Sequence, residues 1–406
     1  MLHWLTKKRM IGGLVFGPPA WMPERIEETF DAPARAPASA AAGTRQETPA
    51  DRAALVALVE RLGIGRTSQV IPGLVEQLRK AGAPLKGLIL NMLPTQPESA
   101  LGGALSRLAI EDLAAGLSAI ESAVAPRRTQ IVLDRHDVRG WRLWRRATRR
   151  WGGGKGRRRP AICLLLNRYP QADPTILMRI LMGKKLPVEA LPVILGYLMV
   201  DPVTCWALGR HLRTGQPFTD RPVQVFMQES PVPRLVMGRL GEPLADFCGR
   251  HHVPGNLKAL QVIVNGMLTG RQADPGSTRI DGLTESITLR EPAEIEKPAA
   301  CLSCGWCVDV CPTGLTPVHL MQLAQRLPVR IPPRGTGPAP AHVPAIPGGI
   351  PPEARTLRSK TVREARHCIA CGLCSYVCPT RLPLMELTLV LRARLAAIKW
   401  EVKHAS

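Results

Sequence analysis

Eight cysteines near the C-terminal end of the chain fall into two groups that share one spacing. The first group is Cys301, Cys304, Cys307 and Cys311, with Pro312 after it. The second group is Cys368, Cys371, Cys374 and Cys378, with Pro379 after it. Three cysteines at steps of three, a fourth four residues later and then a proline are typical of iron–sulfur ligands. Structural zinc, the alternative, usually takes two separated Cys-x-x-Cys pairs.

The spacing also predicts which thiolates act together. Three thiolates at steps of three can wrap three corners of a cubane, and the fourth, on the following helix, points toward the other cluster. We therefore expect two 4Fe-4S clusters with crossed ligands. One is held by Cys301, Cys304, Cys307 and Cys378, and the other by Cys368, Cys371, Cys374 and Cys311. Two clusters so close together would carry single electrons, and Gly305 and Gly372 would let backbone amides approach sulfur.

The other cysteines and the isolated histidines are weaker signals. Cys163, Cys205 and Cys248 lie in apolar runs and are expected to be small buried hydrophobic residues. Three histidines are expected to be surface or capping residues and not ligands. They are His251, His252 and His367.

Charge is the next feature. The 406 residues include 54 basic and 32 acidic ones, and the formal charge of +22 favours an acidic protein, a lipid surface or nucleic acid as partner. Arg127–Arg159 holds 13 basic and two acidic residues. As a helix, this segment would place an arginine stripe beside two tryptophans. The stripe would be Arg142, Arg145, Arg146 and Arg149, beside Trp141 and Trp144.

Two interpretations of this basic segment stay open. It could dock on an anionic membrane surface or an acidic redox partner. It could instead be a solvated arginine face whose tryptophans pack on the core. Nucleic acid is not expected, because no recognised nucleic-acid-binding fold accompanies the segment.

No segment of the sequence predicts a membrane span. The longest apolar run, Leu191–Val200, is too short to cross a bilayer. The N-terminal stretch lacks a cleavage signal, so no signal peptide is expected. Clustered cysteines of this spacing indicate metal binding in a reducing compartment. We expect a cytoplasmic protein, peripheral on the cytoplasmic face of the inner membrane.

Composition and patterning predict four regions. Residues 1–50 are an N-terminal tail with an Ala/Pro-rich linker. Residues 51–220 alternate strand and helix signals, which favours an α/β domain with a mainly parallel sheet. Residues 221–290 read as short strands around one helix, a small α+β module. Residues 291–406 carry the cysteines and are interrupted at 331–352, where 22 residues include eight Pro and four Gly.

Within these regions the patterns predict particular elements. Strands are expected at 85–93, 129–134 and 161–167, and helices at 50–62, 104–124 and 174–184. One helix is expected in the small module, at 243–251. The cysteines should be flanked by helices at 317–326, 353–367 and 384–398.

The cysteine segments resemble the C subunit of Rnf-type ion-translocating electron transport complexes. The motifs CxxCGxCVDxCPxGLxP and CxxCGxCSYVCPxxxPL of that family are matched by Cys301–Pro317 and Cys368–Leu384. RYPQ at 168–171, LMGKKLP at 181–187 and VNGMLTGR at 264–271 are similar to further family segments. The resemblance covers about residues 55–395. It implies a flavin-binding α/β domain, a ubiquitin-like β-grasp module and a helical dicluster ferredoxin domain.

The chain departs from the family where flavin would bind. The family's Gly-rich loop corresponds to Leu62–Pro72, LGIGRTSQVIP, which keeps only Gly63 and Gly65. A phosphate-binding loop needs glycines so that backbone amides can close on the ligand. The acidic turn after Asn91 is replaced by MLPTQPES, and the Gly-Gly-Glu after YPQ by residues 172–174, Ala-Asp-Pro. We therefore expect a degraded flavin site and no FMN.

These features lead to one main hypothesis and three alternatives. The main one is an iron–sulfur electron-transfer subunit of an Rnf-like membrane-associated complex, with other subunits and a ferredoxin-like or flavoprotein redox partner. The chain could instead be an active NADH:acceptor oxidoreductase with a divergent FMN site. A cobalamin-reductase-like protein and a nucleic-acid-binding iron–sulfur protein are the remaining alternatives.

Overall fold

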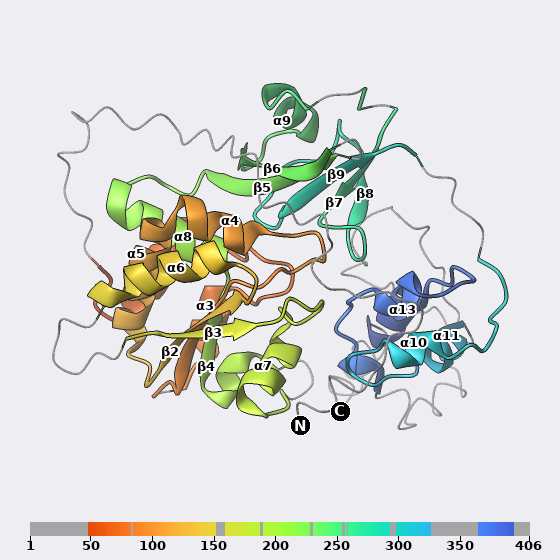
Figure 1. Ribbon diagram of the computed structural model, residues 1–406, viewed down its shortest axis with the longest axis horizontal. Helices are drawn as coiled ribbons and strands as arrows, with labels where there is room; N and C mark the ends of the chain where they lie inside the picture. The colour runs from red at the N-terminus through yellow and green to blue at the C-terminus, as the bar shows by residue number, and fades with distance from the viewer. Residues whose placement is uncertain are drawn as a thin grey trace, which may run out of the picture. The chain divides into compact units, whose positions relative to one another are not determined.

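The computed structural model describes residues 48–82, 84–151, 159–186, 190–227, 230–253, 256–257, 259–292, 298–325 and 364–393 (Figure 1). These residues form two compact units. The larger unit holds residues 48–266 and 274–291, and the smaller one holds 267–273 and 292–393. The insert expected at 331–352 and residues 1–47 lie outside the described residues.

The larger unit contains a four-stranded sheet in which every neighbouring pair is parallel. Its strands are β1 (Gly87–Asn91), β2 (Thr129–Asp134), β3 (Ala161–Leu165) and β4 (Tyr197–Val200). Their order is β3-β2-β1-β4, so β3 and β4 are the edges. The parallel sheet predicted from the sequence is confirmed. The sequence did not predict β4, which occupies the end of the apolar run 191–200.

Several α-helices in the described part of this unit accompany the sheet. They are α2 (Arg52–Arg61), α3 (Leu74–Lys80), α4 (Leu101–Leu108), α5 (Ile110–Val124), α6 (Val138–Ala147), α7 (Pro174–Met182) and α8 (Pro202–Thr214). The single helix predicted at 104–124 is wrong, because Ala109 has non-helical dihedrals (φ −138°, ψ 36°) and separates α4 from α5. The sequence analysis missed α3 and α8. Asp201 caps α8 and Pro202 is its first residue, which are ordinary start signals.

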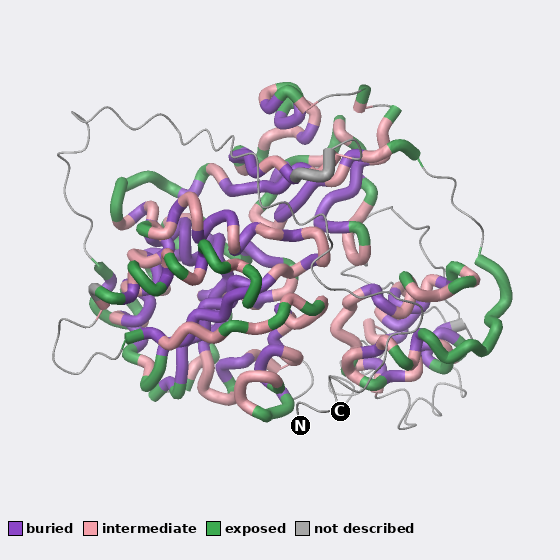
Figure 2. Tube along the Cα trace, viewed as in Figure 1, coloured by how far each residue is buried: buried purple, intermediate pink, exposed green. Residues whose placement is uncertain are grey.

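Alternate residues of β1 face two different cores, and Figure 2 shows the centre of the sheet as buried. Leu88 and Leu90 of β1 pack in a cluster with residues of α2, α3, α4, α5, α6 and α8. Ile89, between them, packs with Leu177 and Met178 of α7. All five residues of β1 are buried. This two-sided burial explains why the central strands read as continuous apolar runs.

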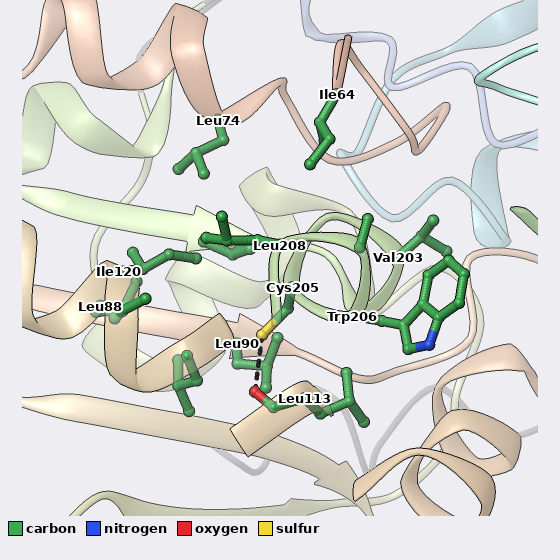
Figure 3. Packing of buried hydrophobic residues seen from close by; sticks show 14 of the residues in the cluster. Ile64, Leu74, Leu88, Leu90, Leu113, Ile120, Val203, Cys205, Trp206 and Leu208 are labelled. Carbon is green, nitrogen blue, oxygen red and sulfur yellow. Dashed lines mark hydrogen bonds between the residues drawn. The ribbon is translucent and has the colours of Figure 1, made fainter. Parts of the chain in front are cut away.

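Helices α5 and α8 cross closely at the larger of these cores (Figure 3). The Cys205 thiol donates a hydrogen bond of 3.2 Å to the Leu113 carbonyl, and burial raises its pKa. Cys248 is buried as well, and burial raises its pKa to about 11. Both cysteines are thus confirmed as buried small residues. The same prediction for Cys163 is wrong, since it is only half-buried on the edge strand β3.

A second sheet follows in the chain. Its elements are β5 (Asp220–Met227), β6 (Ser230–Arg239), α9 (Leu244–Arg250), β7 (Gln261–Val264), β8 (Arg271–Ala273) and β9 (Ser286–Arg290). The strand order is β6-β5-β9-β7-β8, with β5 antiparallel to β6 and parallel to β9. The β5–β6 hairpin is followed in the chain by α9, and β5 and β9 form the parallel pair at the centre of the sheet. This arrangement is that of a β-grasp module. His251, expected at the surface or as a cap, is the C-cap of α9 but is buried against Phe247.

The smaller unit contains short helices around the cysteines. They are α10 (Trp306–Asp309), α11 (Pro317–Gln325), η4 (Ala365–His367) and α13 (Leu373–Tyr376), and residues 384–393 are also helical. The helix predicted at 353–367 lies mostly outside the described residues, and its end at 365–367 is a 3-10 turn. No helix among the described residues has both the length and the apolarity needed to cross a bilayer.

The close crossing of α5 and α8 gives a stability test. A Cβ on Gly209 would lie 1.8 Å from the Asp112 carbonyl oxygen, within the backbone of the facing helix. We expect Gly209→Ala to lower the free energy of unfolding by about 3 kcal/mol or more, because neither helix can move without opening the core. Gly249→Ala in α9 is the control, since its Cβ meets nothing within 4 Å. Urea denaturation should show the control unchanged or slightly stabilised; equal stability of both variants would contradict the close crossing.

Candidate metal centre

The two cysteine loops have the same backbone conformation, repeated 67 residues apart in the chain (Cys301 and Cys368). Ser303 and Ala370, two residues after these cysteines, have φ of 54° and 55°. Gly305 and Gly372 have φ of 79° and 75° and each precedes a four-residue helix. Positive φ favours glycine at the second position, which explains the Cys-Gly pair in both motifs.

The repeat continues beyond the fourth cysteine of each group. Gly314 and Arg381 occupy equivalent turns with φ of 73° and 55°. A helix follows each turn, beginning at residues 317 and 384. The equivalent Leu320 and Leu387 of these helices are buried in one core with Cys307 and Cys311. Each motif is therefore a loop, a short helix, a turn and a longer helix packed against its counterpart.

Four thiols from both motifs line one hollow. Cys311 of the first group lies around it with Cys368, Cys371 and Cys374 of the second group. Burial raises the pKa of Cys374, and the proximity of Cys368, Cys371 and Cys311 raises it further. The apolar part of the wall includes Leu315, Leu320, Leu373 and Met385. The structure thus brings together the four residues that the spacing predicts for one cluster.

Of the other four cysteines, three are neighbours in the structure, and the fourth is Cys378. Burial raises the pKa of Cys307, and nearby Cys304 and Cys301 raise it further, so these three thiols are neighbours. The Sγ atom of Cys378 lies 3.3 Å from the Thr380 hydroxyl. The position of Cys378 as fourth ligand of this group stays a prediction.

Several donors reach the cysteine sulfurs. The Ser303 amide donates to Cys301 Sγ at 3.4 Å, and the Leu315 amide to Cys311 Sγ at 3.3 Å. The hydroxyl of Thr313 lies 3.5 Å from Cys311 Sγ, and the hydroxyl of Thr380 lies 3.3 Å from Cys378 Sγ. Sequence reasoning considered only the glycines and missed both threonines, although Cys-Pro-Thr stands in both motifs. Such donors stabilise thiolates and tune the potential of a bound cluster.

The residues fit an iron–sulfur cluster. Soft thiolates favour iron–sulfur clusters, zinc and copper(I) as metal groups. Here four of them surround a hollow walled by apolar side chains, which restricts water. Within the described part of the chain, no group of three or more Cys, His, Asp or Glu side chains is arranged to hold a single metal ion. His367 is exposed, as expected for a surface residue.

Residues 62–72, where the resemblance implies a flavin loop, make hydrogen bonds to other segments of the chain. Thr67 and Ser68 are buried, and the Thr67 hydroxyl donates a 2.8 Å hydrogen bond to Asp201. Asp201 also accepts from the Val203 and Thr204 amides at the start of α8. A helix N-terminus is a natural phosphate site, and here a carboxylate already takes its amides.

The other polar groups of this region also have partners in the chain. The Arg66 guanidinium donates to the Ser68 carbonyl at 2.8 Å and also to the Gln69 carbonyl. The Gln69 amide donates to Glu285 at 3.1 Å. The Asn91 side-chain amide donates to the Ala172 carbonyl at 2.9 Å, which joins the residue before the replaced acidic turn to the first of the replaced residues 172–174. Residues 66–69 therefore make hydrogen bonds within the chain where the resemblance implies a Gly-rich loop.

Helix α6 has the geometry of the second interpretation of the basic segment, and docking on a membrane or an acidic partner stays a prediction. Trp144 is buried, and its Nε1 donates to Ser106 at 3.0 Å. Trp141 is half-buried, with the Arg145 guanidinium 5.4 Å from its ring. The four arginines of the predicted stripe are all exposed: Arg142, Arg145, Arg146 and Arg149. The tryptophans pack on the protein while the arginines face solvent.

Comparison with known proteins agrees with the cysteine pattern. Residues 293–379 match the 4Fe-4S dicluster domain family. The chain is 24% identical over 233 residues to the C subunit of the ion-translocating oxidoreductase complex of Buchnera aphidicola, covering 55% of this chain and 42% of that protein. The protein of the same name from Rhodobacter capsulatus is 25% identical over 275 residues, covering 67% of this chain and 51% of that protein. The chain thus spans about half, or less, of the length of these relatives.

A solved structure supports the fold alone. A chain of the NAD+-reducing [NiFe]-hydrogenase in its H2-reduced state aligns with a TM-score of 0.50 and 17% identity, covering 69% of this chain and 50% of that chain. The match agrees with a parallel α/β sheet and a second sheet. The relatives and the two cysteine motifs confirm the resemblance predicted from the sequence: the chain is similar to the C subunits of ion-translocating oxidoreductase complexes and has a C-terminal 4Fe-4S dicluster domain.

Proposed function

We propose that the chain is an iron–sulfur electron-transfer subunit of an Rnf-like complex. The observation that carries the proposal is the hollow lined by Cys311 together with Cys368, Cys371 and Cys374. Thiols of two distant motifs around one space support crossed ligation of two 4Fe-4S clusters. The other cluster would take Cys301, Cys304, Cys307 and Cys378.

The protein residues have three tasks in this relay. A 4Fe-4S cluster accepts and releases one electron at a time. The eight cysteines hold the two clusters near each other, the Ser303 and Leu315 amides stabilise thiolate charge, and the apolar wall restricts water. The relay would occupy the dicluster domain at 291–406, after a tail at 1–50, an α/β domain at 51–220 and a β-grasp module at 221–290.

The partners would be other subunits of a membrane-associated complex and a ferredoxin-like or flavoprotein redox partner. The names of the relatives support the complex. The exposed arginines of α6 would bind an anionic membrane on the cytoplasmic face of the inner membrane. The α/β domain would serve as a docking body without FMN. In loop 62–72 the polar groups of Arg66 and Thr67 already hydrogen-bond to the chain itself.

Metal analysis tests the clusters. Anaerobically purified protein should contain about eight iron atoms and eight acid-labile sulfides. Cys378→Ser should damage the cluster of Cys301, Cys304 and Cys307, so its EPR spectrum should resemble that of Cys304→Ser. Cys311→Ser is the matched control, and its spectrum should resemble that of Cys371→Ser. Zinc without sulfide would refute the clusters, and the opposite pairing of spectra would refute the crossed ligands.

Charge removal tests the membrane surface. Replacing the exposed arginines of the predicted stripe by serine should release the protein from membranes at low salt, because attraction to anionic lipid depends on surface charge. These are Arg142, Arg145 and Arg146 of α6 and Arg149 of the 3-10 helix η1 (Thr148–Arg150). The control removes four exposed charges elsewhere on the same unit and should leave binding unchanged. The control set is Arg61, Arg79, Lys80 and Lys86. Equal sedimentation of both variants with anionic vesicles would mean that the stripe is only a solvated face.

Flavin analysis tests the docking body. The purified chain should carry no FMN, and NADH should not bleach the cluster absorbance, because Asp201 occupies the amides at the start of α8. Isothermal titration with added FMN should give no saturable heat. Stoichiometric FMN, or bleaching by NADH without another subunit, would restore the alternative of an NADH:acceptor oxidoreductase.

A further inference from the structure

The two cysteine loops share a backbone but differ in how much of their surface is covered. In the second loop, Ile369 is half-buried and Leu373 is 7% exposed. At the equivalent positions of the first loop, Leu302 is 67% exposed and Trp306 is 40% exposed. Two large apolar side chains in solvent, four residues apart on one loop, are typical of a contact surface.

A segment of the same compact unit covers the second loop. The carbonyl oxygen of Leu268 lies 2.6 Å from the position that a Cβ on Gly372 would take, and the Leu268 Cβ lies 3.3 Å from it. A Cβ on Gly305 would meet nothing within 4 Å. Positive φ favours glycine in both loops, but only Gly372 is also closely packed. Among the residues that the structure describes, the equivalent face of the first loop is therefore open.

The exposure of the cysteines differs between the two loops in the same way. Cys301 and Cys304 are exposed, whereas Cys368 and Cys371 are half-buried. Electron transfer between proteins weakens steeply with distance, so a cluster bound at the exposed thiols is the better contact point. Residues 298–308, PAACLSCGWCV, include no acidic or basic residue, and Lys297 and Asp309 flank them in the sequence. Contact there would depend on apolar burial and not on charge.

We propose that the open face, formed by Leu302, Gly305 and Trp306 around Cys301 and Cys304, is the docking surface for a one-electron carrier protein. The carrier would present an apolar turn next to its own cofactor, and this turn would pack on Gly305 as residue Leu268 packs on Gly372. One electron leaves the carrier's cofactor and one enters the adjacent cluster, and no other reactant takes part. The inference rests on the proposed function and adds which motif faces the partner.

The test uses the full chain and a reduced two-cluster ferredoxin as the carrier. In stopped-flow mixing, Leu302→Asn with Trp306→Gln should slow bleaching of the clusters by about tenfold or more, and raise the dissociation constant of the oxidised ferredoxin similarly. The bleaching rate and dissociation constant of the wild type should change little between about 50 mM and about 500 mM salt, since residues 298–308 carry no acidic or basic side chain. Tyr376→Gln is the matched control, because Tyr376 is 50% exposed on the other motif's helix.

The outcomes separate this inference from the proposed function. Iron content and reduction by methyl viologen radical should match wild type in both variants. With these intact, an unchanged ferredoxin affinity and rate in the double variant would overturn the docking surface alone. Dissociation of a dimer by the same substitutions would assign the face to a second copy and overturn it too. Absence of iron and sulfide from wild type would instead refute the proposed function.

Discussion

The position of Cys311 constrains the whole C-terminal unit. It comes from the first motif but lines the hollow with three cysteines of the second. Both loops must therefore turn in the same way, and the helices after them must pack together, as the burial of Leu320 and Leu387 shows. A long Pro/Gly-rich insert is compatible with this arrangement, because the entropy of loop closure grows slowly with length.

The larger unit has a comparable polar constraint at the start of α8. Asp201 accepts from two amides of that helix and from the Thr67 hydroxyl. These groups are buried, so opening the loop would leave donors without partners, at a cost of about 1–3 kcal/mol for each. Buried hydrogen bonds of Asp201 therefore connect the loop at 62–72 to the start of α8.

The exposed arginines of α6 and the exposed apolar residues of the first cysteine loop would bind partners by different interactions. Helix α6 presents arginines over tryptophans that pack on the protein, so any binding there should weaken with salt. The first cysteine loop presents Leu302 and Trp306 within residues 298–308, which include no acidic or basic residue, so binding there should depend on buried apolar area. A subunit of a complex could thus hold one partner by charge and another by apolar contact.

The sequence by itself determined the features that depend on local spacing. Thiolates at fixed steps predicted the iron–sulfur motifs, and the apolar runs predicted β1, β2 and β3, because residues close in the chain carry these patterns. Helix α8 was missed since nine of its 13 residues are buried, which removes the amphipathic pattern. Tertiary structure alone decided that Leu268 covers Gly372 while Gly305 stays open, that Trp144 is buried and that Cys163 is on an edge. Each of these depends on a contact between segments that are far apart in the chain, and no local pattern records it.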